Sequence, residues 1–315
     1  MNIQWYPGHM TKTRRQMTED VKFVDLVAEV VDARIPISSR NPDIDAMVGD
    51  KPRMIIFNRA DQADPAQTAV WKSWFREKGF AVLETDAKTG KGVREFSAVV
   101  KAALKDKIEQ WKDKGQVGRP VRVMVVGVPN VGKSTFINKV AKRKSAKAGD
   151  RPGVTRGKQW VNVDSGLDML DTPGILWPKF EDQTVGMHLA FTGAVKDEVV
   201  DIEELAAALL ELLRDRYPVS LRERYKLEPT ADAKGWELLE QAARKRGMLI
   251  SGGEVDSERM ARVLLDEYER QRGSITTSDG ATQGIRYTSV PASGDCRSVS
   301  ATVTGLSSGQ GYQFY

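Results

Sequence analysis

Short apolar runs, each bounded by turn-forming residues, recur through the first half of the chain. They are rich in β-branched side chains, as buried strands are. These runs span residues 24–31, 54–57, 81–83, 121–126, 160–163 and 167–170. Residues 68–78 and 93–111 lie between them and have helical periodicity. The alternation predicts an α/β domain with a mostly parallel sheet, at residues 1–178. The turn at 164–166 predicts a hairpin, and hence an antiparallel edge.

In the second half the hydrophobic pattern becomes helical. Residues 199–213, 235–246 and 257–271 place apolar side chains at helical spacing, which predicts a small all-α domain at residues 179–273. The last residues, 274–315, are rich in serine, threonine and glycine. A solvated tail, one or two short strands, or an end altered by a change of reading frame all explain this composition.

Composition removes several function classes. Of 315 residues, 40% are hydrophobic and 29% charged, as in soluble globular proteins. No apolar run approaches the ~18 residues of a membrane span, so we expect no membrane partner. The N-terminus lacks the apolar core of a signal peptide, so we expect a cytoplasmic protein. A single cysteine, Cys296, and two histidines argue against a disulfide framework and a zinc site.

Charge is unevenly distributed. The net charge is +5, yet residues 1–180 hold 32 lysines and arginines against 21 acidic residues. Eight of these basic residues lie in the run 139–158, together with one acidic residue. Such a run can bind RNA phosphates, although ordinary surface charge explains it as well.

Residues 127–134 match the phosphate-binding pattern G-x-x-x-x-G-K-[ST]. A predicted strand precedes them and a helix can open after them, as this motif requires. Backbone N–H groups and the helix N-terminus would hold the phosphates. Lys133 is predicted to reach the β- and γ-phosphates, and the Ser134 hydroxyl to bind Mg²⁺. The predicted phosphate-binding residues are Pro129, Asn130, Val131, Gly132, Lys133, Ser134 and Thr135.

Two further elements select GTP over ATP. Asp171-Thr-Pro-Gly174 matches D-x-x-G, in which Asp171 can hold Mg²⁺ through water and the Gly174 N–H can contact the γ-phosphate. Asn58-Arg59-Ala60-Asp61 follows a predicted strand and resembles the guanine-reading N-K-x-D box. The Asp61 carboxylate can accept hydrogen bonds from guanine N1–H and the exocyclic amine, a donor pair that adenine lacks. Arg59 replaces the usual lysine, and its stem and planar head can still cover the base.

Two weaker elements complete the predicted site. Asp86, Ala87 and Lys88 resemble the S-A-K loop that contacts the guanine O6 through backbone N–H groups, with aspartate in place of serine. Thr155 lies between the phosphate loop and Asp171, where a switch I threonine would contact Mg²⁺ and the γ-phosphate.

The order of these elements differs from that of Ras-like GTPases, in which the phosphate loop comes first. Here residues 58–61 and 86–88 precede 127–134, and 171–174 come last. A circular permutation explains this order, because a domain can be re-cut at surface loops. The D-x-x-G element then adjoins the helical domain, so a change at the γ-phosphate can move that domain.

These motifs in this order resemble the YlqF/RbgA family, ribosome biogenesis GTPase A. The opening Ile3–Met10, with its Pro-Gly-His-Met, and the segment Lys245–Glu254 also carry the resemblance, which covers residues 1 to about 273. It implies a bacterial or organellar GTPase that acts late in assembly of the large ribosomal subunit. It also implies that the C-terminal helices contact ribosomal RNA, and no DNA partner is expected.

Catalysis needs a separate explanation, because Ile175 occupies the position of the glutamine that orients water in Ras-type enzymes. The resemblance implies His9 in that role, and packing or RNA binding by His9 is the alternative. With His9, the predicted catalytic residues are Lys133, Thr155 and Gly174. We treat the second histidine, in the helical part, as structural.

Asn130 occupies a phosphate-loop position that can help to hold K⁺, which would supply positive charge where an arginine finger otherwise acts. Shaping of the loop explains this asparagine as well. The leading hypothesis is therefore a GTP-hydrolysing assembly factor for the large ribosomal subunit. The alternative, favoured by Ile175, is a nucleotide-gated RNA-binding module with incidental hydrolysis. The box at 58–61 argues against a metabolic ATPase or kinase.

Overall fold

The computed structural model describes residue 3, residues 5–141, 159–164, 166–195 and 197–270, and the short strands β7 (Ile275–Thr276) and β8 (Thr282–Gln283). Thr155, the basic residues of the run beyond Lys139, and most of the C-terminal tail lie outside the described residues. No helix in the described part of the chain is both long enough and apolar enough to cross a bilayer.

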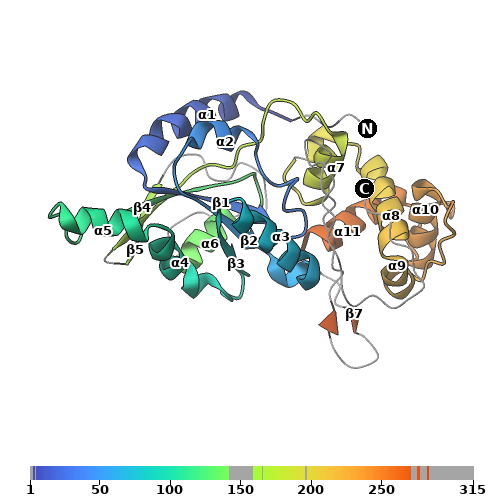
Figure 1. Ribbon diagram of the computed structural model, residues 1–315. Helices are drawn as coiled ribbons and strands as arrows, with labels where there is room; N and C mark the ends of the chain where they lie inside the picture. Colours follow the sequence, from blue (N-terminus) through green and yellow to red (C-terminus); the bar gives the residue numbers. More distant parts are fainter. Residues whose placement is uncertain are drawn as a thin grey trace.

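A six-stranded sheet organises the first part of the chain, with strand order β3-β2-β1-β4-β6-β5 (Figure 1). Five strands are parallel, and β5 runs antiparallel to β6 at one edge. Each strand predicted from the apolar runs is present within two residues. The strands are β1 (Leu26–Asp32), β2 (Arg53–Asn58), β3 (Ala81–Glu84), β4 (Val121–Val126), β5 (Gln159–Asp164) and β6 (Leu167–Asp171).

The strand order brings the nucleotide motifs together despite their order in the sequence. Strand β1 pairs in parallel with β2 on one side and with β4 on the other. Strand β4 in turn pairs in parallel with β6. Since the carboxyl ends of parallel strands share one edge, the loops after β2, β4 and β6 meet there. This edge is where ligands bind in open α/β sheets.

Helices cover both faces of the sheet, with α1 and α2 above it and α4 and α6 below it in the view of Figure 1. The helices of this part are α1 (Gly8–Asp20), α2 (Asp43–Val48), α3 (Pro65–Glu77), α4 (Phe96–Ala103), α5 (Lys105–Asp113) and α6 (Lys133–Val140). Short 3₁₀ turns are η1 (Val21–Phe23), η2 (Ala60–Gln62) and η3 (Val93–Glu95). The stretch 93–111 is helical as expected, and the buried Leu104 leaves helical geometry and separates α4 from α5.

The second part of the described chain is all helical. It contains α7 (Gln183–Phe191), η4 (Asp197–Val199), α8 (Ile202–Arg216), α9 (Pro218–Tyr225), α10 (Gly235–Lys245) and α11 (Ser257–Arg270). Helix α8 is central and contacts α7, α9, α10 and α11. Asp201 caps α8 by accepting hydrogen bonds from the N–H groups of Glu203 and Glu204.

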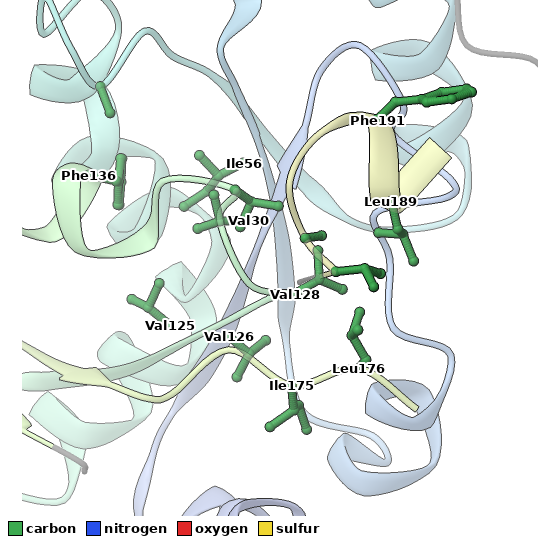
Figure 2. Packing of buried hydrophobic residues seen from close by; sticks show 14 of the residues in the cluster. Val30, Ile56, Val125, Val126, Val128, Phe136, Ile175, Leu176, Leu189 and Phe191 are labelled. Atoms are coloured by element: carbon green, nitrogen blue, oxygen red, sulfur yellow. The ribbon is translucent and has the colours of Figure 1, made fainter. Parts of the chain in front are cut away.

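One apolar core continues from the sheet into these helices. Val30, Val125 and Phe136 belong to the same buried cluster as Leu189 and Phe191 of α7, and Figure 2 shows residues of this cluster. Ile175 and Leu176, which follow β6, belong to the same cluster. The helices are therefore packed against the nucleotide edge of the sheet by buried apolar side chains.

Two buried polar contacts strengthen this junction. Arg34, which follows β1, is fully buried and donates to the Asp32 carboxylate from Nε (2.9 Å) and Nη2 (2.6 Å). Its Nη1 donates to the carbonyl of Tyr268 in α11 at 2.8 Å. On α7, the Nδ1 atom of His188 lies 2.9 Å from the Ser38 hydroxyl. Burial lowers the pKa of His188 to about 4, so the ring is neutral at physiological pH, consistent with a structural role.

We predict that Arg34→Ala destabilises the protein by ~3–5 kcal/mol, because it leaves the buried Asp32 carboxylate without its close counter-charge and with Arg59 3.8 Å away. Arg15→Ala is the matched control, since Arg15 pairs with Glu19 on the exposed face of α1 and should cost less than ~1 kcal/mol. Urea unfolding of both variants measures the difference. Equal and small losses would show that the buried pair does not hold the junction.

Candidate nucleotide-binding site

The phosphate loop connects β4 to α6, and Lys133 is the first residue of that helix. The buried Lys133 ammonium donates to the carbonyls of Gly127 (3.1 Å) and Val128 (2.9 Å). Burial lowers the pKa of Lys133 to about 8. Among the described residues no side-chain hydrogen bond caps the N-terminus of α6, so its backbone N–H groups and the positive end of its dipole can serve an anion.

Asp171 lies at the end of β6 and is almost completely buried. Its Oδ1 atom has no hydrogen-bond partner among the described residues. Burial raises the pKa of Asp171 to about 6, against the opposing charge of Lys133. A buried carboxylate oxygen without a donor suits a divalent cation, so the residues present fit Mg²⁺, which Asp171 and the Ser134 hydroxyl would hold.

The D-x-x-G element packs directly on the phosphate loop. A Cβ atom at Gly174 would lie 2.8 Å from both the Cα and the nitrogen of Pro129, and 3.0 Å from the Lys133 ammonium. Real Cβ atoms do not approach backbone atoms this closely, so only glycine fits. The Gly174 backbone is thereby held beside the lysine expected to bind the γ-phosphate.

The Asn58 amide joins three loops of the site. Its Nδ2 donates to the carbonyl of Val131 in the phosphate loop at 2.8 Å. Its Oδ1 accepts from the backbone N–H of Ala87 at 3.0 Å. The guanine box, the phosphate loop and the 86–88 loop, all predicted from the sequence, are therefore brought together by one side chain.

The Asp86 side chain holds the backbone of the 86–88 loop, at the position where an S-A-K loop has serine. Its Oδ1 accepts from the N–H groups of Lys88 (2.8 Å) and Thr89 (3.2 Å). Asp61 lies in η2 close enough to Asp86 to be affected by it, since burial and then the Asp86 charge raise the pKa of Asp61. A ligand that donates hydrogen bonds to Asp61 would relieve this unfavourable charge.

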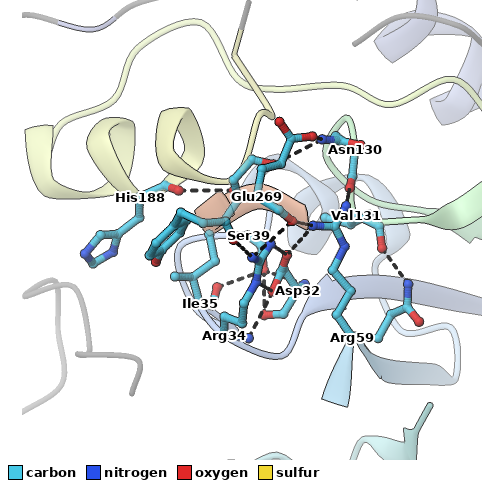
Figure 3. Close-up of polar contacts among 12 residues, drawn as sticks. Asp32, Arg34, Ile35, Ser39, Arg59, Asn130, Val131, His188 and Glu269 are labelled. Carbon is cyan, nitrogen blue, oxygen red and sulfur yellow. Dashed lines mark hydrogen bonds and ion pairs between the residues drawn. The ribbon is translucent and has the colours of Figure 1, made fainter. Parts of the chain in front are cut away.

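The Arg59 guanidinium, which was expected to help cover the base, makes other contacts in this structure. It adopts a left-handed conformation with φ of 59°. Its Nη2 donates to the carbonyl of Asn130 at 2.9 Å, and its Nη1 donates to the carbonyl of Glu269 at 3.1 Å (Figure 3). The guanidinium is thus engaged by the phosphate loop and by α11, and only the aliphatic stem remains to cover a base.

The two residues considered for water positioning lie in different environments. Ile175 is fully buried in the apolar core, and its carbonyl accepts from the Asn41 amide at 3.2 Å. It cannot orient water. His9 is exposed in the first turn of α1, and the sulfur of the neighbouring Met10 accepts from the Leu176 N–H at 3.5 Å. The Pro-Gly-His-Met segment therefore lies beside the switch segment that follows Asp171.

The structure adds contacts that sequence reasoning missed. The Asn130 Nδ2 atom donates to Glu269 Oε1 at 2.7 Å and to the Thr192 carbonyl at 3.1 Å. Arg34 is the other missed residue, through its contacts with α11. Glu269 lies 139 residues from Asn130 in the chain, so no local pattern could have indicated the pair.

The fold and the site define a P-loop GTPase with a permuted motif order. The family described as "50S ribosome-binding GTPase" matches residues 122–234. Ribosome biogenesis GTPase A of Priestia megaterium is 46% identical over 281 residues, which make up 89% of this chain and 97% of that protein. The protein of the same name from Thermotoga maritima is 31% identical over 84% of this chain and 89% of its own. The chain belongs to the ribosome biogenesis GTPase A family (YlqF/RbgA) and is a GTPase.

Solved structures agree with this assignment. The structure described as GDP-bound TM YlqF is similar with a TM-score of 0.58 and 28% identity, over 86% of this chain and 99% of that one. GNP-bound YlqF from T. maritima gives a TM-score of 0.56 at 30% identity, over 82% and 94% of the two chains.

An organellar protein is also similar in sequence. Mitochondrial ribosome-associated GTPase 1 of Xenopus tropicalis is 34% identical over 77% of this chain and 80% of its own.

We predict that Asp61→Asn weakens GTP and GDP binding by about 5- to 150-fold while leaving ATP binding as weak as before, because a guanine donor then lacks its acceptor at a cost of ~1–3 kcal/mol. Asp113→Asn, at the exposed end of α5, is the control. Displacement of a fluorescent guanine nucleotide by GTP and ATP measures both affinities. If Asp61→Asn keeps full discrimination between GTP and ATP, the guanine is read elsewhere.

Proposed function

We propose that this chain hydrolyses GTP with Mg²⁺ as an assembly factor for the large ribosomal subunit, in the cytoplasm, and that docking to the subunit's RNA activates it. The single observation that carries the proposal is the Asn58 amide, which ties the guanine box to the phosphate loop. The names of the relatives supply the ribosomal partner. Residues 1–178 would form the GTPase domain and residues 179–273 the ribosome-contacting domain, and we assign no role to 274–315.

The chain's own residues would each perform a separate task on GTP. Lys133 would bind the β- and γ-phosphates, and the Gly174 N–H would contact the γ-phosphate. Ser134, Asp171 and Thr155 would hold Mg²⁺, which when bound neutralises charge on the phosphates. The hydrogen-bond-free Oδ1 of Asp171 supports this part. Asn130 would offer its amide oxygen to K⁺, because its nitrogen is already bound by Glu269 and Thr192.

Hydrolysis by the free protein should be slow, because the buried Ile175 offers no hydrogen bond to water. His9 is our proposal for the missing group. It is exposed, and Met10 next to it is anchored to Leu176 in the switch segment. A shift of that segment on ribosome docking would carry His9 with it. A neutral imidazole can orient water at physiological pH.

Two groups of basic residues support RNA as the partner. The basic run 139–158 flanks the nucleotide site in the sequence. In the helical part, Arg244 and Lys245 are exposed at the end of α10, and the Lys245 ammonium donates to the carbonyl of Lys226 after α9. These exposed cations at the end of α10 suit a phosphate backbone. The buried Ile175 favours the second candidate, a nucleotide-gated RNA-binding module with incidental hydrolysis.

Single-turnover GTP hydrolysis, with and without purified large ribosomal subunits, distinguishes these two functions. We predict a rise of roughly 10³–10⁵-fold on the subunit, the range seen when a missing catalytic group is supplied to a GTPase. His9→Ala should lose most of this rise and keep its GTP affinity, because water is oriented only on the way to the transition state. Gln16→Ala, exposed further along α1, should behave like the parent.

Stimulation of His9→Ala to the level of the parent would remove the catalytic role of His9. Absence of stimulation in the parent itself would favour the RNA-binding module over the assembly GTPase.

A further inference from the structure

Three distant segments meet beside the phosphate loop: Asn130 of the loop, the turn Thr192–Gly193 after α7, and Glu269 in the last turn of α11. We infer that Glu269 is a positioning residue of the phosphate site. It fixes the Asn130 amide so that the amide oxygen is presented for a monovalent cation, and it thereby makes cation use by the GTPase depend on the docking of α11. This inference rests on the cation role proposed above for Asn130.

The hydrogen bonds determine which way the Asn130 amide faces. Its two partners are a carboxylate oxygen of Glu269 and the carbonyl oxygen of Thr192, and both can only accept. The amide nitrogen, with two N–H donors, must therefore face them. The amide oxygen is turned away, and within the described part of the chain it accepts no hydrogen bond. Without Glu269, one N–H would lose its acceptor, and the amide would lose the stronger of the two contacts that set its orientation.

The hydrogen-bonded pair of Asn130 and Glu269 packs closely against Gly193. Gly193 ends α7 with φ of 70°, while its N–H donates to Ala190 and the next N–H donates to Leu189. A Cβ atom here would lie 2.8 Å from Asn130 Nδ2 and 2.8 Å from the carboxyl carbon of Glu269. The hydrogen bond between the two side chains is thus packed directly against the turn that follows α7, and only glycine leaves room for it.

The backbone of Glu269 is itself held from the nucleotide side. Its carbonyl accepts from Arg59 Nη1 at 3.1 Å and from Arg34 Nη1 at 3.4 Å. The preceding carbonyl, of Tyr268, accepts from Arg34 Nη1 at 2.8 Å. Carbonyls in the last turn of a helix carry partial negative charge and lack intrahelical partners, so two arginines are matched to them. Figure 3 shows both guanidinium groups converging on the end of α11.

These contacts assign Glu269 a part in the site that no phosphate-loop residue supplies. Arg34 and Arg59 hold the backbone at the end of α11, and the Glu269 carboxylate then holds the Asn130 amide of the phosphate loop. Residues that orient a metal ligand affect cation affinity about 10- to 100-fold when they are removed. Loss of α11 docking would lower the cation affinity in the same way, because Glu269 reaches Asn130 only while the backbone of Glu269 is held by the two arginines.

The test measures cation use by a binding signal rather than by turnover. Fluorescent GDP with aluminium fluoride and Mg²⁺ forms a transition-state-like complex, and its formation is titrated with KCl and with NaCl at constant ionic strength. We expect Glu269→Ala to raise the half-saturating K⁺ concentration about 10-fold or more while GDP affinity without fluoride stays within twofold. Glu269→Gln, which keeps an acceptor oxygen, should recover most of the K⁺ response. Glu258→Ala, exposed at the start of the same helix, is the control.

A double-mutant comparison distinguishes the positioning role of Glu269 from a merely structural role. If Glu269 acts through Asn130, then adding Glu269→Ala to Asn130→Ala should change the K⁺ response no further. Gly193→Ala should displace the pair and mimic Glu269→Ala, which keeps the test decisive if the latter folds poorly. A parental K⁺ response in Glu269→Ala overturns the inference. A parent that forms the complex equally well in Na⁺ removes the cation role of Asn130 and this inference together, but leaves subunit-stimulated hydrolysis standing.

Discussion

The Asn58 side chain makes the interaction on which the nucleotide site depends. One amide bonds to loops 29 and 73 residues away, and it can do so because the strands before those loops are parallel and end at one edge. The order of the motifs along the chain is irrelevant to this geometry, whereas the order of the strands in the sheet is essential. A permuted chain can therefore build a GTPase site as long as β1 lies between β2 and β4.

The helical part is joined to that site by two kinds of contact. Buried apolar side chains after β6 and on α7 continue the core of the sheet. Their burial stabilises the junction in proportion to the apolar area removed from water, and it has no directional requirement. The hydrogen bonds that two arginines make to the end of α11 are directional; Arg59 comes from the guanine box and also contacts the phosphate loop, and Arg34 comes from the loop after β1. A change at the phosphate loop can therefore reach α11 through Arg59 and Asn130, while the apolar core keeps the two parts in contact.

Local patterns predicted the sheet, three helices of the second part and the motif loops, because burial on a strand or on one helix face leaves a short-range signature. Helices α1 and α9 escaped prediction because few of their residues are buried, Met10 and Met17 being the buried apolar residues of α1. The contacts of Arg34 with α11 span 234 and 235 residues and depend on how two parts of the chain pack. The position of Ile175 indicated a missing catalytic group, but its burial became visible only in three dimensions.

The central proposal is that this chain docks on the large ribosomal subunit with GTP bound, so that docking can activate hydrolysis. Co-sedimentation with separated ribosomal subunits, in a non-hydrolysable GTP analogue and in GDP, tests it most directly. The account predicts that the protein pellets with the large subunit in the analogue and is largely released in GDP, with little binding to the small subunit in either state. Equal binding in both nucleotide states, or a preference for the small subunit, would contradict it.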